Sequence, residues 1–276
     1  MRLWQDTISS TLFLSRLPVS GLLAVERRDA LPEFQETAHT FPLAGAVIGL
    51  LPAALVYAGG LLGLSGTLLA WIAIATLVIT TGALHEDGLG DVVDGFWGGH
   101  ERERKLDIMR DSAIGTYGVL ALIVSIGGKA TALGAVLNNV TPALGAALIL
   151  MACALSRTAM LYPWYSLPNA RDALDDTTDA AGKTKAGLSS RFGEPDFHTY
   201  LRGCLWCLPF LALLWATCGI AALVLGLGLV KVATLLATRL ARHHIQGHTG
   251  DVLGATQQLA ELAFWLGLAI AFSIAG

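Results

Sequence analysis

The chain has 276 residues, of which 54% are hydrophobic and only 14% are charged. Because soluble domains carry about 25% charged residues, this composition excludes an ordinary soluble protein and predicts a polytopic membrane protein in a lipid bilayer. The net charge of −3 and the lack of a basic tract argue against nucleic-acid binding. We therefore expect an all-α fold that forms a single membrane domain over residues 1–276.

The expected helices follow one another with polar loops between them. Residues 7–17 predict an amphipathic or re-entrant helix near the membrane, and no cleavage site of a signal peptide follows it. A membrane-spanning helix needs about 20 apolar residues. About seven stretches approach this length: residues 41–61, 65–84, 117–137, 143–162, 204–218, 220–240 and 254–274. Gly219 separates the fifth stretch from the sixth.

The positions of Lys and Arg predict which side of the membrane each loop occupies. None of the 18 Lys and Arg residues lies in the short turns after the first, third and fifth helices. The polar loops at residues 85–116, 163–203 and 241–253 hold most of them. By the positive-inside rule, these three loops are expected to be cytoplasmic.

Five aspartates gather in the first of these loops. They are Asp87, Asp91, Asp94, Asp107 and Asp111. The first three are spaced i, i+4 and i+7, which predicts that they lie on one face of a helix. The last two are spaced i and i+4, which predicts one face of a second helix. The glycines at positions 98 and 99 allow the chain to turn between the two helices.

Carboxylates held on facing helices repel one another unless a cation lies between them. Their hard oxygen atoms suit Mg²⁺, Mn²⁺ or Ca²⁺, and this stretch has no cysteine for a thiolate zinc site. We therefore predict a divalent-metal site that binds phosphates. The alternative is a solvated acidic loop that keeps an apolar protein soluble at its ends.

Four charged residues interrupt the apolar stretches, where a charge in hydrocarbon costs a few kcal/mol or more. Lys129 lies midway along its predicted helix, and we predict that it is functional. Glu261 is expected either to pair with Lys129 or to complete the metal site. Arg157 lies near the cytoplasmic end of its helix, where a functional and a structural role are both open. Lys231 is expected to be structural.

Three further features accompany the predicted metal site. His85 precedes Asp87 by two residues and is predicted to be a general base or a metal ligand. The glycine-rich loop at residues 246–251 can hold phosphate oxygens with its backbone amides. Asp251 is then a further metal ligand or, alternatively, the cap of the last helix. The loop at residues 169–191 lacks the spacing of a P-loop and is expected to be solvated.

Carboxylates, a metal and nearby cations together suit phosphoryl or nucleotidyl transfer. The spacing of Asp91, Asp94 and Gly95, followed by Asp107 and Asp111, is similar in part to CDP-alcohol phosphotransferases. A second set of motifs covers more of the chain. It consists of FLSRLPV at residues 13–19, FPLAG at 41–45, HEDGLGDVVDG at 85–95, IMRDS at 108–112, IGTYG at 114–118, Lys129, Ser156–Arg157, and GDVLGA at 250–255 ahead of Glu261. Together these motifs resemble the cobalamin synthase family, the adenosylcobinamide-GDP ribazoletransferases.

This resemblance implies a Mg²⁺-dependent enzyme of the bacterial inner membrane that acts late in the assembly of the vitamin B12 nucleotide loop. Its substrates would be adenosylcobinamide-GDP and α-ribazole or its 5′-phosphate, and GMP would leave. The implied site residues are Asp87, Asp91, Asp94, Asp107 and Asp111 for the metal, His85, Asp87 and Lys129 for catalysis, and Arg110, Ser112, Arg157, Gly250 and Asp251 for substrate binding.

Two other classes of protein stay open. A CDP-alcohol phosphotransferase acting on a lipid alcohol would use the same acidic site. A membrane transporter would also carry Lys and Glu within the membrane, but the carboxylates here cluster on one side, which favours an enzyme. A homo-oligomer is compatible with the sequence and is not required by it.

Overall fold

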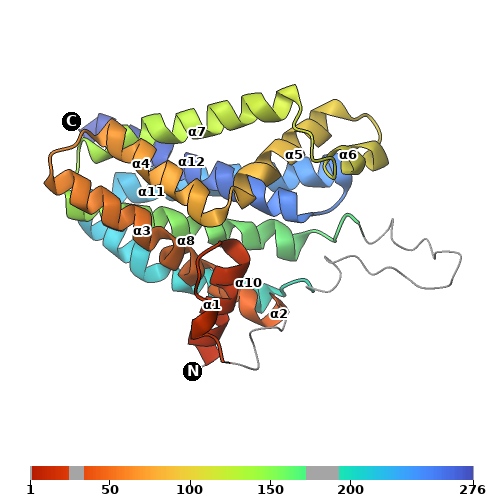
Figure 1. Ribbon diagram of the computed structural model, residues 1–276, viewed down its shortest axis with the longest axis horizontal. Helices are drawn as coiled ribbons and strands as arrows, with labels where there is room; N and C mark the ends of the chain where they lie inside the picture. The colour runs from red at the N-terminus through yellow and green to blue at the C-terminus, as the bar shows by residue number, and fades with distance from the viewer. Residues whose placement is uncertain (1, 25–33, 172–192, 276) are drawn as a thin grey trace, which may run out of the picture.

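The structure, a computed structural model, describes residues 2–24, 34–171 and 193–275. These residues form a bundle of long helices that run side by side, with shorter helices at its edges (Figure 1). The helices are α1 Arg2–Leu14, η1 Ser20–Leu22, α2 Phe34–Thr37, η3 Ala38–Thr40, α3 Phe41–Leu61, α4 Gly66–Thr81, α5 Leu84–Gly98, α6 Arg102–Ile108, α7 Thr116–Leu137, α8 Pro142–Ser166, α10 Phe197–Trp206, α11 Leu208–Ile245 and α12 Gly250–Ala275. The expected all-α fold is confirmed.

Five stretches of the described chain are long and apolar enough to cross a membrane. They are Phe34–Leu61, Thr116–Leu137, Pro142–Ser166, Phe197–Ile245 and Gly250–Ile274, and the bent pair α4 and α5 makes a sixth if it counts as one span. The sequence led us to expect about seven. The counts differ because α4 has only 16 residues and because two expected helices belong to the single stretch Phe197–Ile245.

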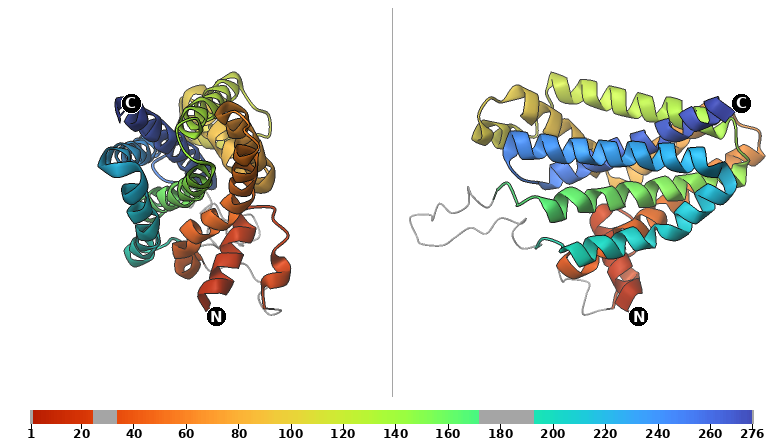
Figure 2. Two further views of the ribbon diagram at one scale, coloured as in Figure 1. Left: turned by 90° about the vertical axis from the view of Figure 1, so that its left-hand side faces the viewer. Right: turned by 180° about the vertical axis from the view of Figure 1, so that it is seen from behind.

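Gly219 breaks that long stretch. Its φ of 80° and ψ of 178° are not helical. A straight helix over all 49 residues would be about 74 Å long, more than twice the roughly 30 Å hydrocarbon core of a bilayer. The chain turns back at this point, so the parts before and after Gly219 run in opposite directions (Figure 2). The break expected between the fifth and sixth helices is therefore present.

The chain bends sharply between α4 and α5. Gly82 and Ala83 both adopt the left-handed conformation, with φ of 63° and 59°, and the two helices meet at an angle of 88°. The backbone N–H of Arg16 donates to Thr80 O at 2.7 Å. A Cβ added at Gly82 would lie 2.1 Å from Arg16 Nε. This elbow directs α5 away from the line of α4, so that α5 packs against α7 and α12.

The N-terminal helix packs on the bundle as a separate element. α1 begins at Arg2, earlier than the expected residues 7–17, and ends at Leu14. It lies against α3 and η3. The ring of Phe13 lies 4.5 Å from that of Phe34, and the ring of Phe34 lies 5.6 Å from that of Trp164. An aromatic cluster therefore attaches the helix to the core.

Gly45 allows the backbones of α3 and α8 to lie close together. A Cβ added there would lie 2.3 Å from Cys153 O and 3.1 Å from Arg157 Cδ. We expect Gly45→Ala to destabilise the protein by about 1–3 kcal/mol, because the two helices must separate. Thermal unfolding in detergent measures this effect. The control is Gly127→Ala on α7, where an added Cβ would meet no atom of the described ranges within 4 Å. An equal loss of stability in both variants would contradict the packing argument.

Candidate functional site

Helix α5 carries the first three aspartates on one face, as the spacing predicted. Asp87 is exposed, Asp91 is partly buried and Asp94 is buried. A Cβ added at Gly88 would lie 2.8 Å from Asp251 O, so this glycine allows the backbones of α5 and α12 to touch. The start of α12 thereby lies beside the acidic face of α5.

Asp94 has a structural role that the spacing did not reveal. Its two carboxylate oxygens accept hydrogen bonds from the backbone N–H groups of Gly115 at 2.7 Å and Gly118 at 2.9 Å. These amides belong to the first turn of α7, where a carboxylate also interacts favourably with the helix dipole. A side chain on either glycine would collide with Asp94. Asp94 therefore fastens α5 to the start of α7.

The second pair of aspartates does not form the expected helix face. α6 ends at Ile108, so Asp107 lies on the helix and Asp111 lies in the turn beyond it. Asp111 Oδ1 accepts from the backbone N–H of Ala113 at 3.0 Å, a turn-type contact that competes with helix continuation. Both carboxylates are exposed, and so are the predicted substrate-binding residues Arg110 and Ser112.

Asp251 lies beside the acidic face of α5 and is paired with a cation. Its Oδ2 lies 3.1 Å from Arg171 Nη2 and accepts from Thr249 Oγ1 at 3.1 Å. Thr249 is also the residue that caps α12, since its Oγ1 accepts from the N–H of Val252 at 3.3 Å. The alternative in which Asp251 is the cap is therefore wrong. Asp87, Asp94 and Asp251 are the carboxylates whose charges act on Asp91.

The three polar loops meet at one end of the bundle. Arg102 on α6 donates from Nε to Ile245 O at 2.9 Å and from Nη2 to Ala170 O. The backbone N–H of His248 donates to Pro168 O at 2.8 Å, so this amide of the glycine-rich loop is already used. No atom of the described residues lies within 4 Å of a Cβ added at Gly250. The expectation of a solvated loop at residues 169–191 falls largely on residues 172–192, outside the described residues.

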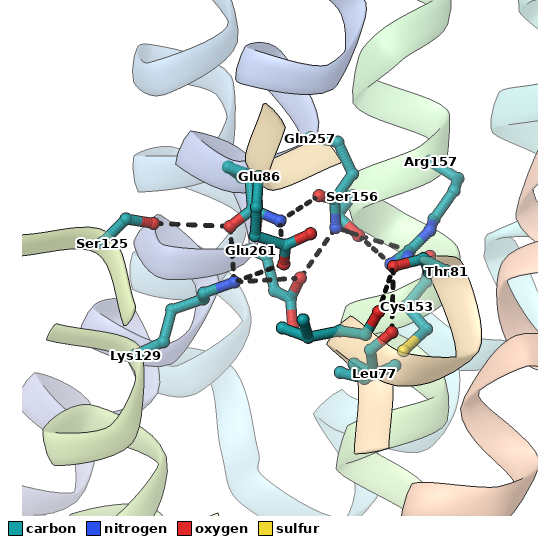
Figure 3. Close-up of polar contacts among 12 residues, drawn as sticks. Leu77, Thr81, Glu86, Ser125, Lys129, Cys153, Ser156, Arg157, Gln257 and Glu261 are labelled. Atoms are coloured by element: carbon teal, nitrogen blue, oxygen red, sulfur yellow. Dashed lines mark hydrogen bonds and ion pairs between the residues drawn. The ribbon is translucent and has the colours of Figure 1, made fainter. Parts of the chain in front are cut away.

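A second polar region consists of buried side chains inside the bundle (Figure 3). Lys129 Nζ donates to Gln258 Oε1 at 2.6 Å and lies 3.9 Å from both Glu86 Oε1 and Glu261 Oε2. The pairing of Glu261 with Lys129 is one of the two expected alternatives. Because these groups come from α5, α7 and α12, the network joins three helices.

The same network continues to α8. Gln257 Nε2 donates to Glu261 Oε2 at 2.7 Å and to Ser156 Oγ at 3.1 Å, and Arg157 Nη1 donates to Ser156 Oγ at 3.1 Å. Arg157 is only 1% exposed. The two cations Lys129 and Arg157 therefore balance two buried carboxylates within one network.

His85 faces this interior rather than the acidic face. It is 1% exposed, and its backbone lies against Gly254 of α12. Within the part of the chain that the structure describes, its Nε2 has no hydrogen-bond partner. The structure thus separates the predicted site residues into two groups. Asp87, Asp91 and Asp251 lie at the end of the bundle, whereas His85, Lys129 and Arg157 lie inside it.

A polar cavity of about 730 Å³ lies between α1, α2 and α10, and sequence reasoning did not find it. Its lining includes Arg2, Glu36, Asp196 and Arg202. Arg2 pairs with Glu36. The backbone N–H of Thr199 donates to Asp196 Oδ1 at 2.7 Å, and this bond holds the pKa of Asp196 below its usual range.

The fold and the site define a polytopic α-helical membrane protein. Its helix α5 carries an exposed and a partly buried carboxylate and is joined through Glu86 to a buried network of paired charges. The family model described as cobalamin-5-phosphate synthase matches residues 6–269 of the chain. The chain therefore belongs to the cobalamin-5-phosphate synthase family, and the resemblance seen in its motifs is confirmed.

Curated relatives agree with this assignment. A Sinorhizobium medicae protein named adenosylcobinamide-GDP ribazoletransferase is 40% identical over 269 residues, 97% of each chain. A Brucella anthropi protein of the same name is 41% identical over 272 residues, 96% of each chain. No solved structure matches the chain. The relatives' names identify the family as one of transferases.

Proposed function

We propose that the chain transfers the adenosylcobinamide-phosphate group of adenosylcobinamide-GDP to α-ribazole or α-ribazole 5′-phosphate. A ribose hydroxyl oxygen forms a bond to the phosphorus attached to cobinamide, and the bond from that phosphorus to GMP breaks. The hydroxyl proton passes to a base, and GMP leaves with the electrons of the broken bond. The observation that carries this proposal is the family match over nearly the whole chain.

We place the reaction at the acidic face of α5. Asp87 and Asp91 are the carboxylates there that are not buried, and Asp251 lies beside them. Of the three residues predicted as catalytic, only Asp87 is exposed, so it is the proposed group that orients the attacking hydroxyl. Arg171, which pairs with Asp251, is the guanidinium that we propose contacts a phosphate.

We propose Mg²⁺ as the cofactor. Among the residues that the structure describes, no three His, Cys, Asp or Glu side chains form a ready-made metal site. Mg²⁺ is usually held by one or two carboxylates together with substrate phosphates, so its binding does not require a ready-made site of three side chains. Asp87 and Asp91 are the proposed protein ligands, and Asp251 lies beside them. When bound, the ion would offset the charge on the phosphates.

We also propose that this end of the bundle faces the cytoplasm of a bacterium whose inner membrane holds the protein. The Lys and Arg residues concentrated in the three polar loops support this orientation.

Removing divalent cations is expected to stop GMP release almost completely. The experiment uses the purified protein in lipid vesicles with adenosylcobinamide-GDP and α-ribazole 5′-phosphate. GMP is followed by chromatography before and after EDTA, and then after Mg²⁺ is restored. Full activity in EDTA would contradict the proposed role of the metal but not the proposed reaction.

The same vesicles test the reaction and its two alternatives. We expect GMP and a complete corrinoid to appear in equal amounts. Consumption of CDP-diacylglycerol instead would assign the chain to the lipid-alcohol phosphotransferases. Movement of the corrinoid across the bilayer without GMP release would indicate a transporter.

A further inference from the structure

Helix α5 is attached by hydrogen-bonded side chains near both of its ends. Towards its C-terminal end, Asp94 accepts from the first turn of α7. In its first turn, Glu86 points into the core, where Gln258 Nε2 donates to Glu86 Oε1 at 2.8 Å. Asp87 and Asp91, the proposed reaction-centre carboxylates, lie between these two attachments.

Gln258 uses its whole hydrogen-bonding capacity. Its Oε1 accepts from Lys129 Nζ at 2.6 Å and from Ser125 Oγ at 3.4 Å. Its Nε2 donates to Glu86 at 2.8 Å and to Gln257 Oε1 at 2.9 Å. A primary amide offers two donor hydrogens and two acceptor lone pairs, and all four are occupied here. With the side chain 1% exposed, the orientation of this amide is fixed by its partners.

The elbow before α5 explains why such an attachment is needed. At Gly82 and Ala83 the backbone leaves the right-handed helical conformation. The direction of α5 is therefore not fixed by a continuous helix with α4. The direction depends on what α5 touches. Glu86 is adjacent to Asp87 and lies about 7.5 Å along the helix axis from Asp91, so a shift at Glu86 moves both carboxylates.

Helix α12 carries both Gln258 and Asp251. They are seven residues apart, about two turns, and so lie on the same face of the helix. The hydrogen bond between Gln258 and Glu86 therefore joins the helix that presents Asp251 to the helix that presents Asp87 and Asp91.

We propose that Gln258 is a positioning residue: by holding Glu86, it sets where Asp87 and Asp91 on α5 lie relative to Asp251 on α12. Its effect on turnover rests on the proposed function. Its effect on the order of α5 does not.

Gln257 provides a matched control. It is the neighbouring residue, it is the same amino acid and it is equally buried, at 0% exposed. Its donor atom faces Glu261 and Ser156 rather than α5. Gln257→Leu and Gln258→Leu therefore remove the same chemical group from the same helix, but only the second removes a contact with α5.

The first experiment compares the two leucine variants in lipid nanodiscs. Hydrogen–deuterium exchange is measured for peptides covering residues 84–98 and for peptides of α3 and α8. We expect Gln258→Leu to speed exchange in α5 at least tenfold, with little change in α3. Where wild-type turnover is present, kcat should fall roughly 10- to 100-fold, with a smaller change in KM, as for other residues that orient a reactive group. Gln257→Leu removes one of the four partners of Gln258 but leaves its hydrogen bond to Glu86 in place, so exchange in α5 should rise far less than in Gln258→Leu.

If Gln258→Leu does not fold, the inference can be tested by exchanging the amide and the carboxylate between positions 86 and 258. Gln258→Glu places a second carboxylate against Glu86, and Glu86→Gln alone removes a negative charge that offsets Lys129. In the double variant, an amide at position 86 donates to a carboxylate at position 258, which still accepts from Lys129. We expect the double variant to protect α5 better than either single variant, as coupled neighbours do.

Two results would overturn the inference. One is equal exchange in α5 for Gln257→Leu and Gln258→Leu. The other is a double variant no better protected than its single variants. If the wild-type protein releases no GMP, the proposed function fails, whereas the exchange data still decide whether Gln258 positions α5.

Discussion

Replacing Asp91 with asparagine is expected to lower kcat about 10²- to 10³-fold without destabilising the protein, the size of effect seen when a charge-stabilising group is removed from an active site. The change keeps the shape of the side chain and removes one charge from a group of carboxylates that includes Asp87 and Asp251. Removing a repelling charge favours the folded state. GMP release and thermal unfolding, measured on the same preparation, check both parts of the expectation.

Asp94→Asn is the control for this substitution, and it should behave differently. The carboxylate accepts from two backbone amides, whereas an asparagine amide has only one acceptor atom. One N–H group in the first turn of α7 would lose its partner, at a cost of about 1–3 kcal/mol. Near-normal turnover of Asp91→Asn, or an equal loss of stability in both variants, would show that the division of roles is wrong.

Replacing Lys129 with methionine is expected to cost the largest amount of stability, about 3–5 kcal/mol. The substitution would leave Glu86 and Glu261 buried with one fewer cation to balance them. Thermal and chemical unfolding in detergent measure the loss. Adding Glu261→Gln to Lys129→Met should recover part of the lost stability, because it removes one of the unbalanced charges.

Lys231→Met tests whether this cost comes from the network. Lys231 also interrupts a long apolar helix, but it is exposed and forms no ion pair within the described ranges. Its replacement should not destabilise the protein, because no buried carboxylate loses a cation and an apolar side chain suits a membrane-spanning helix. Equal losses at positions 129 and 231 would contradict the charge-balance account.

Much of the helical framework could be predicted from the sequence because it depends on local properties. The spacing of Asp87, Asp91 and Asp94 places them on one helix face whatever surrounds that helix. Gly219 could be recognised as a candidate break because a glycine within a long apolar run readily leaves the helical conformation.

The parts that sequence reasoning missed depend on contacts between distant segments. Asp94 follows the same spacing as its neighbours, and only the fold shows that it fastens α5 to α7. The elbow depends on Ala83, a residue with no intrinsic preference for the left-handed conformation. Gln257 and Gln258 had one detectable signal, which is the presence of two adjacent amides within an apolar helix just before Glu261.

Iron-mediated cleavage of the backbone tests the central claim, that the acidic face of α5 holds the reacting phosphates and their metal. Fe²⁺ replaces Mg²⁺ in the presence of adenosylcobinamide-GDP, peroxide and ascorbate generate radicals at the bound ion, and the fragments are mapped by mass spectrometry. We predict cuts near residues 87–91 and near residue 251, and their loss in Asp91→Asn. Cuts confined to the polar cavity between α1, α2 and α10, unchanged in that variant, would contradict the account.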